Sequence, residues 1–141
     1  MNILFDIRTL GDKHLTGVGV YTFNVLENLL KKDRENRYFL FMNKSKIIDL
    51  NIQAKLLEFE KKYNAKILRL NYPNKIFNLF LKLKLIKIDE LLSKRFNINF
   101  DLYFAPNINY INISNKIKFI LTVHDLSFVL FPELFNFKQR L

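Results

Sequence analysis

The feature that most constrains the fold is the opening stretch of the chain, Asn2–Leu30 (NILFDIRTLGDKHLTGVGVYTFNVLENLL). Asn2–Asp6 is a short apolar run that ends in a carboxylate, and helical periodicity begins at Val20. The segment between them holds all three glycines of the chain: Gly11, Gly17 and Gly19. This order predicts a strand, a loop and a helix, the first half of a βαβ unit. Because the first amide groups of a helix have no intrahelical partner, the loop favours an anionic or hydroxyl-rich ligand.

The glycine loop matches neither of two familiar phosphate-binding motifs. A dinucleotide fingerprint requires glycine or alanine where this chain has Thr22, and no Gly-Lys-Ser/Thr sequence follows as it would in a P-loop. A purely structural interpretation also stays open, in which Gly17 and Gly19 allow a tight turn and close packing of helix on strand.

Length and composition limit the number of domains, the kinds of site and the partners that we expect. A chain of 141 residues is long enough for one domain with a real core. Cysteine is absent, which is compatible with a reducing cytoplasm, and the two histidines, His14 and His124, belong to no spaced ligand cluster, so we expect no metal site. The net charge of +10 favours an acidic partner. The sequence predicts neither an export signal nor a membrane span.

Strand and helix patterns alternate along the rest of the chain. Further strands are predicted at Tyr38–Met42, Ala65–Leu70, Asp101–Pro106 and Lys116–Val123, helices at Val20–Leu30, Ile52–Tyr63, Lys75–Phe96 and from Pro132, and loops at Asn43–Asp49 and Asn107–Ser114. This alternation predicts an α/β fold with a doubly wound, mostly parallel, Rossmann-like sheet. Ligands bind outside the carboxyl ends of the strands in such folds. Four candidate residues fall at those ends: Gly17, Gly19, Asn107 and His124.

The segment Lys75–Phe96 is unusually basic and apolar. Its apolar residues cover more than one helical stripe, and its basic residues face only Asp89 and Glu90: Lys75, Lys82, Lys84, Lys87, Lys94 and Arg95. A helix of this kind could rest on an anionic membrane, with Lys82, Lys84 and Lys87 as contacts. The alternative is a helix packed on the sheet with a solvated basic face. Part of the segment, Lys82–Ile88, also alternates like a strand.

His124 and Asp125 follow the last predicted strand. A histidine at a strand end could hydrogen-bond a sugar hydroxyl or exchange a proton near neutral pH, although a capping role is equally open. Adjacent residues of an extended strand point to opposite faces, so the pair forms a dyad only if the backbone has already turned. We find no nucleophile elbow and no paired acids in the sequence.

Four segments together resemble one enzyme family. They are Asp6-Ile7-Arg8, Thr16-Gly17-Val18-Gly19-x-Tyr21-Thr22, Tyr103-Phe104-Ala105-Pro106, and Thr122-Val123-His124-Asp125-Leu126-Ser127-Phe128 followed by Phe131-Pro132-Glu133. In their order and spacing they resemble the amino-terminal domain of family-4 glycosyltransferases. These are retaining enzymes of the GT-B fold, often mannosyltransferase-like, so the resemblance implies that residues 1–141 form the amino-terminal half of a GT-B architecture.

The resemblance implies roles for particular residues. His124 would be the catalytic histidine that faces the transferred hexose, and the substrate-binding positions would be Arg8, Thr16, Gly17, Gly19, Asn107 and Asp125. This domain would hold the acceptor, a sugar or a lipid-linked glycan, while the nucleotide-sugar donor would bind a carboxyl-terminal domain. The family needs no catalytic metal, and many members act at the inner face of the membrane, which would make the protein cytoplasmic or peripheral.

The chain departs from the family pattern because the donor-binding domain is missing. We therefore expect residues 1–141 alone to be inactive, with an incomplete sheet, an unpaired edge and a tendency to aggregate. A second interpretation is a non-catalytic binding module at an anionic membrane surface. Nucleic acid is a weaker candidate partner, since the aromatic residues lie mainly in apolar runs rather than on a basic face.

Overall fold

A parallel β-sheet organises the protein, whose computed structural model describes residues 1–11, 15–43, 49–131 and 133. Within these residues the sheet has five strands in the order β3-β2-β1-β4-β5, and all neighbours run parallel. The strands are β1 (Asn2–Asp6), β2 (Arg37–Asn43), β3 (Ala65–Leu70), β4 (Leu102–Ala105) and β5 (Lys118–Leu121). The prediction of a parallel α/β, Rossmann-like sheet is confirmed. The strand order reverses between β1 and β4.

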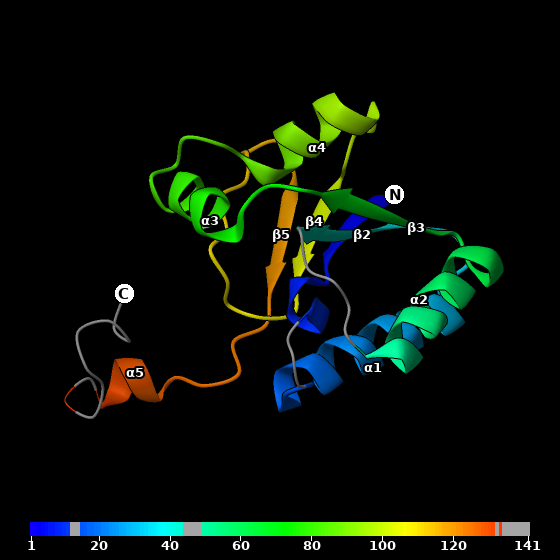
Figure 1. Ribbon diagram of the computed structural model, residues 1–141, viewed down its shortest axis with the longest axis horizontal. Coiled ribbons are helices and arrows are strands. Elements are labelled where there is room, and N and C mark those ends of the chain that lie inside the picture. Colours follow the sequence, from blue (N-terminus) through cyan, green and yellow to red (C-terminus); the bar gives the residue numbers. More distant parts are fainter. Residues whose placement is uncertain (12–14, 44–48, 132, 134–141) are drawn as a thin grey trace.

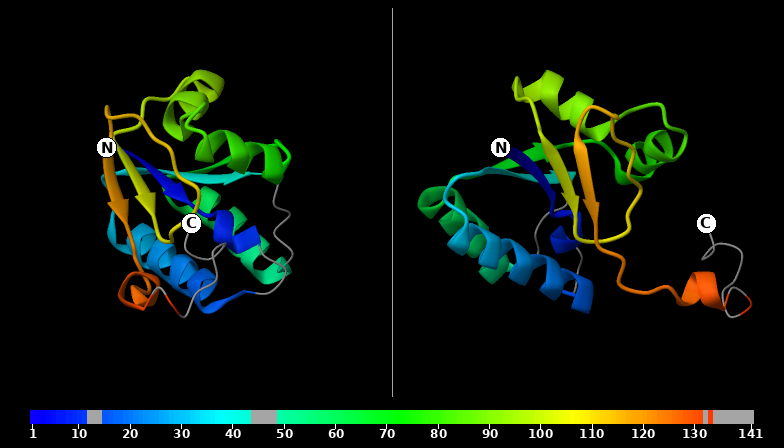
Figure 2. Two further views of the ribbon diagram at one scale, coloured as in Figure 1. Left: turned by 90° about the vertical axis from the view of Figure 1, so that its left-hand side faces the viewer. Right: turned by 180° about the vertical axis from the view of Figure 1, so that it is seen from behind.

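Helices cover the two faces of the sheet (Figures 1 and 2). On one face lie α1 (Gly17–Lys32) and α2 (Leu50–Lys62), and on the other lie α3 (Asn74–Lys82) and α4 (Ile88–Phe96). A short 3-10 turn, η1 (Arg8–Gly11), follows β1, while α5 (Ser127–Leu130) stands away from the sheet beyond the end of β5. Two N-caps set the starts of α1 and α2: Thr16 accepts from Gly19, and Asp49 accepts from Asn51 and Ile52.

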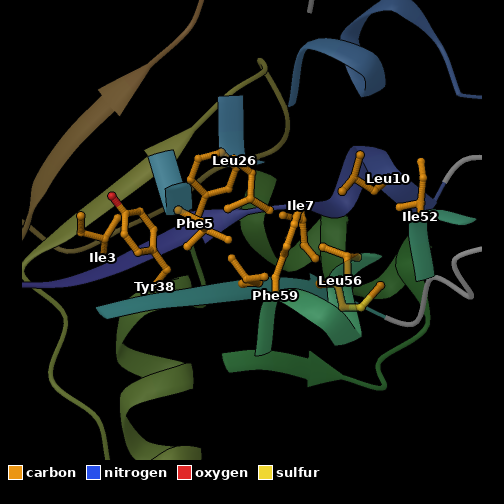
Figure 3. Packing of buried hydrophobic residues seen from close by; sticks show 12 residues of the cluster. Ile3, Phe5, Ile7, Leu10, Leu26, Tyr38, Ile52, Leu56 and Phe59 are labelled. Carbon is orange, nitrogen blue, oxygen red and sulfur yellow. The ribbon is translucent and has the colours of Figure 1, made fainter. Parts of the chain in front are cut away.

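Each face of the sheet has its own apolar core. Figure 3 shows the first, in which Phe5 of β1 and Leu26 of α1 meet Leu56 and Phe59 of α2. The second core packs β1, β2 and β4 against α3 and α4, with Phe41, Tyr103 and Leu92 fully or nearly fully buried. Side chains of β1 and β2 therefore face apolar neighbours on both sides, as expected for central parallel strands.

The prediction of one helix over Lys75–Phe96 is wrong, because two helices occupy the segment. The helix α3 ends at Lys82, and Lys84 takes the left-handed conformation with φ 57°. Asn112 then holds the start of α4: its amide donates to the carbonyl of Ile86, and its own carbonyl accepts from the amide of Ile88. A left-handed residue cannot continue a right-handed helix, so the turn at Lys84 separates the two.

Other element bounds differ slightly from the predictions. The strand β5 covers less than the predicted Lys116–Val123, and α1 begins at Gly17 rather than Val20 because Thr16 is its cap. Apart from residue 133, the helix predicted from Pro132 lies outside the described residues, as do residues 44–48 of the predicted loop.

The strand β5 is the sheet edge next to β4, and its apolar side chains are exposed. Phe119 and Ile120 are each 45% exposed and Leu121 is 38% exposed. The backbone of Thr122 still donates to the carbonyl of Ala105, so the β4 side of the strand is paired. Among the described residues, no strand pairs with the opposite side of β5.

Candidate functional site

The candidate site lies at the carboxyl ends of β1, β4 and β5, where the strand order reverses. In doubly wound sheets, the loops on the two sides of this reversal diverge and leave a crevice in which ligands bind. Here the loops after β1 and β4 begin at Ile7 and Pro106, and the chain after β5 leads to His124. The glycine loop, the end of β4 and the His124 segment therefore meet at the carboxyl ends of the strands.

A buried ion pair lies beneath the candidate site, at the carboxyl end of β1. The Asp6 carboxylate accepts from Arg8 Nε at 3.0 Å, from Arg8 Nη2 at 2.7 Å and from the Tyr103 hydroxyl at 2.9 Å. The side chains of Arg8 and Asp6 are only 11% and 2% exposed. Burial, the largest single effect, would lower the pKa of Arg8, but the charges and hydrogen bonds of Asp6 and Tyr103 together outweigh burial and raise the pKa. Burial, followed by the charge of Asp6, raises the pKa of Tyr103 well above its usual value, so the phenol stays a donor.

The guanidinium of Arg8 is held by protein acceptors on several sides. Besides Asp6, its Nη1 and Nη2 each donate to the Tyr110 carbonyl at 3.2 Å, and it lies 5.3 Å from the centroid of the Phe41 ring. Arg8 thus ties the loop after β4 to the end of β1. That Arg8 binds substrate stays a prediction, and its hydrogen bonds indicate that it also positions the loop.

The start of α1 presents backbone groups to the site. Thr16 Oγ1 accepts from the amide of Gly19 at 3.4 Å, whereas the amides of Gly17 and Val18 have no partner among the described residues. A Cβ built on Gly17 would have no atom within 4 Å, so space is open beside this residue. An acceptor group of a ligand could bind to the two amides.

Gly19 has a different environment from Gly17. It is buried, and a Cβ at this position would lie 2.6 Å from Leu15 Cδ1 and 3.6 Å from the carbonyl of Thr9. The absent side chain therefore allows α1 to approach Leu15 and η1 closely, which is the structural interpretation that the sequence left open. A hydrogen bond of 3.2 Å between Thr9 and Thr22 further fixes η1 on α1.

His124 joins the ends of β4 and β5 to α1. Its Nε2 lies 2.7 Å from the carbonyl oxygen of Pro106, and its ring meets Tyr21 edge-to-face with centroids 4.8 Å apart. The Tyr21 hydroxyl is 3.3 Å from Thr122 Oγ1, a residue 101 positions away in the sequence. Since Tyr21 follows Gly17 by one helical turn, both lie on the same side of α1. His124 is exposed, and these contacts hold its ring in place.

Asp125 does not form a dyad with His124. Its Oδ1 accepts from the amide of Ser127 at 2.7 Å, and its Oδ2 accepts from the Ser127 hydroxyl at 2.6 Å. These bonds from Ser127 hold the pKa of Asp125 below its usual value. The carboxylate stabilises the turn into α5, and its predicted contact with substrate stays a prediction.

Asn107 follows Pro106 directly and is half-buried at the end of β4. Its side-chain amide makes no hydrogen bond to a described residue, which leaves the two N–H donors and the carbonyl oxygen for a ligand. Asn107 and His124 are therefore linked through Pro106, one by the chain and the other by a hydrogen bond.

Tyr21 and Thr122 are the contacts that sequence reasoning did not assign to the site. Both belong to motifs that were recognised, and the spacing of Tyr21 from Gly17 could have placed it on the ligand-facing side of α1. An open hollow of ≈ 710 Å³ begins at Tyr21 and follows α1 toward Asp33, lined also by Asn24, Val25, Asn28, Leu29 and Lys32. It lies along the flank of α1 rather than above the strand ends.

The described residues also bear on a metal site and on a membrane span. No three side chains of His, Cys, Asp or Glu in this part of the chain lie close enough together to hold a metal ion, and His14 lies outside it. None of the described helices is both long and apolar enough to cross a membrane.

Comparisons of the chain with protein-family models, with curated proteins and with solved structures find no match.

Proposed function

We propose that this chain is the acceptor-side domain of a retaining glycosyltransferase of the GT-B type, similar to family 4. The enzyme would transfer a hexose from a nucleotide sugar to a hydroxyl group of a sugar or lipid-linked glycan, in the cytoplasm or at the membrane's inner face. One observation carries the proposal: Tyr21, Pro106 and His124, from three separate segments of the resemblance, are in contact. Contact between distant segments is what a shared binding site requires.

The hydrogen bond to Pro106 assigns a role to each nitrogen of His124. A backbone carbonyl only accepts, so Nε2 carries the hydrogen. In the neutral ring, Nδ1 then keeps a lone pair, and no described residue donates to it. This atom would accept a hydrogen bond from a sugar hydroxyl and so fix the orientation of the sugar. Tyr21 prevents the ring from tilting away.

Neighbouring groups complete the proposed subsite. The amides of Gly17 and Val18 would donate to a sugar oxygen or to the donor diphosphate, and Asn107 would bond a second hydroxyl. The Asp6–Arg8 pair would act indirectly, by holding the loop that carries Asn107. The nucleotide sugar enters this proposal as a co-substrate bound mainly by a second domain, and the proposed reaction requires no metal.

A binding experiment on residues 1–141 tests the acceptor site. Saturation-transfer NMR with simple glycosides should detect binding to the wild type and a clear loss in His124→Ala and Asn107→Ala. Asn51→Ala, at the exposed start of α2, is the matched control and should bind like the wild type. Equal signals from His124→Ala and the wild type would contradict the proposed site.

An activity experiment tests the enzyme class. The coding frame should continue past codon 141 into a second α/β domain, and the longer product should release nucleotide from a nucleotide sugar when an acceptor is present. His124→Ala in that product should lower kcat by roughly 100-fold or more. A frame that stops at Leu141 with a stable 17.0 kDa product in the cell would overturn the proposal of a transferase.

A further inference from the structure

The helix α3 has an apolar side that faces away from the sheet as well as one that faces the core. Phe77 and Leu81 are each 2% exposed and pack into the core beneath the helix. Ile76, Leu79 and Leu83 recur at spacings of three and four, and they are 50%, 51% and 56% exposed. A helix that only covers a sheet needs a polar outer side, so packing does not explain this second apolar stripe.

The exposed stripe continues beyond the end of α3. We define the α3 outer surface by five exposed apolar residues of α3 and the following turn: Ile76, Leu79, Phe80, Leu83 and Leu85. A small apolar hollow of ≈ 180 Å³ adjoins it, lined by Tyr72, Ile76, Phe77, Phe80, Ile86 and Leu91. The surface lies on the side of the sheet opposite α1 and α2 (Figure 1). Contiguous exposed apolar groups of this kind mark a contact with a partner or a membrane.

Three lysines lie at the margin of the α3 outer surface. Lys75 and Lys82 are separated by two helical turns and lie on one flank of α3, and Lys84 occupies the left-handed turn beside Leu83 and Leu85. All three are exposed, and no acidic side chain of the described residues forms an ion pair with them. Lys87 differs, because it pairs with Glu90 at 3.2 Å. The unpaired positive charge is therefore concentrated at Lys75, Lys82 and Lys84.

We propose that the α3 outer surface binds a lipid bilayer that contains anionic lipids. An apolar centre with lysines at its margin matches the interface of such a bilayer, where leucine and phenylalanine enter the acyl boundary and lysine ammonium groups reach the lipid phosphates. Nucleic acid would meet the lysines but leave the aliphatic groups in water. A protein partner would need acidic groups around an apolar patch, and a second copy of this chain is tested below as the alternative.

The first experiment measures how the full 141-residue chain distributes between water and vesicles. It should float with vesicles of phosphatidylcholine and phosphatidylglycerol and stay in solution with phosphatidylcholine alone. Replacing Lys75, Lys82 and Lys84 with Gln should lower the partition coefficient by about 100-fold, from the contribution expected of three surface lysines. In the matched control, Gln replaces three exposed lysines outside the α3 outer surface: Lys32, Lys61 and Lys66. This variant should retain most of the vesicle binding.

A second pair of variants tests the apolar part of the surface. Leu79→Ser with Leu83→Ser should abolish flotation, whereas Leu50→Ser with Leu57→Ser on α2 should leave it unchanged, although those leucines are 77% and 48% exposed. Circular dichroism of each variant establishes that the fold is kept. Equal flotation of both pairs would overturn the proposal, because binding would then depend on net charge rather than on this surface.

A fluorescence experiment tests insertion directly, since the chain contains no tryptophan. Leu79→Trp should show a blue-shifted emission when anionic vesicles are added, and Leu57→Trp should not. An unchanged Leu79→Trp spectrum would overturn the proposal. So would vesicle-independent dimers that Leu79→Ser dissociates, because the surface would then bind a second copy. Since vesicle binding requires no sugar transfer, its failure is distinguishable from failure of the proposed glycosyltransferase function.

Discussion

The two edges of the sheet differ in how they meet solvent. In β3, Leu68 and Leu70 are fully buried while Lys66 and Arg69 are exposed. In β5 all four residues are exposed, and Phe119, Ile120 and Leu121 are apolar. The β3 edge therefore has the charged outer residues that natural sheets use against unwanted pairing, whereas the β5 edge combines apolar side chains with backbone groups that pair with no other described strand.

The difference follows from which helices cover each edge. The strand β3 has α2 on one face, and its Leu68 and Leu70 pack into the core that α3 and α4 cover on the other. The chain after β5 instead leads outward to α5, so no described helix lies over β5 (Figure 2). The region from β3 to β1 thus has helices over both faces, whereas β5 presents a surface that no described helix covers. This agrees with the proposed second domain.

The largest effect should be the difference in unfolding free energy lost when a phenylalanine is truncated in β1 and in β5. Phe5→Ala in β1 removes a fully buried ring stacked on Phe104 at 4.9 Å and should lower the free energy of unfolding by about 4 kcal/mol. Phe119→Ala in β5 should cost only about 1 kcal/mol, because nearly half of the ring is already in water. Denaturant titration measures both values. Similar costs would show that β5 is as well packed as β1.

The next effect concerns the buried Asp6–Arg8 ion pair, which lies in the region that helices cover on both faces. Asp6→Asn leaves the Arg8 guanidinium without its counter-charge and should cost about 3 kcal/mol in denaturant titration. The double variant with Arg8→Gln should cost less than the sum of the single changes, because the two groups interact directly. Additive costs would contradict the interaction that the structure shows between them.

A smaller effect on stability should accompany a large change in association. Ile120→Lys adds a charge to the β5 edge and should reduce self-association in light scattering, with a change in unfolding free energy of about 0.5 kcal/mol or less. The converse change, Lys66→Ile in β3, should increase association. If Ile120→Lys leaves association unchanged, the β5 edge does not mediate self-association.

The last effect is a pH dependence in the turn after α1. Hydrogen bonds from Asn36 and from the Tyr38 hydroxyl hold the pKa of Asp33 below its usual 3.8. A lowered pKa contributes stability above the usual value, and this contribution is lost as the pH falls through the lowered one. Asp33→Ala should therefore cost about 1 kcal/mol at pH 7 and progressively less below about pH 4.

Asp125, beyond β5, is the matched control for this titration. Its pKa is also lowered, by Ser127, but it is fully exposed and caps only the turn into α5. Asp125→Asn should leave the pH dependence of unfolding unchanged in thermal melts. A loss of pH dependence in Asp125→Asn, but not in Asp33→Ala, would show that Asp125 rather than Asp33 links stability to pH.

Strands with a strong local pattern were predicted best. The bounds of β1 and β3 agree with those expected: Asn2–Asp6 contains a short apolar run, and Ala65–Leu70 combines four apolar residues with Lys66 and Arg69. The helix over Lys75–Phe96 failed because apolar residues are so frequent there that helical and alternating patterns overlap. Backbone hydrogen bonds from Lys84 to Leu81 and from Leu85 to Phe80 close the turn, and the contacts of Asn112 with the backbone at Ile86 and Ile88 hold the chain that follows it.

The sequence by itself determined the class of fold and the location of the candidate site. Hydrophobic periodicity is local, and parallel strands bring their carboxyl ends to one edge, so the positions of Gly17, Asn107 and His124 followed. The tertiary structure alone decided the distant partners: Arg8 with Tyr110, and His124 with Pro106 and Tyr21. Such partners depend on distances between segments remote in the chain, and a local pattern carries no information about those distances.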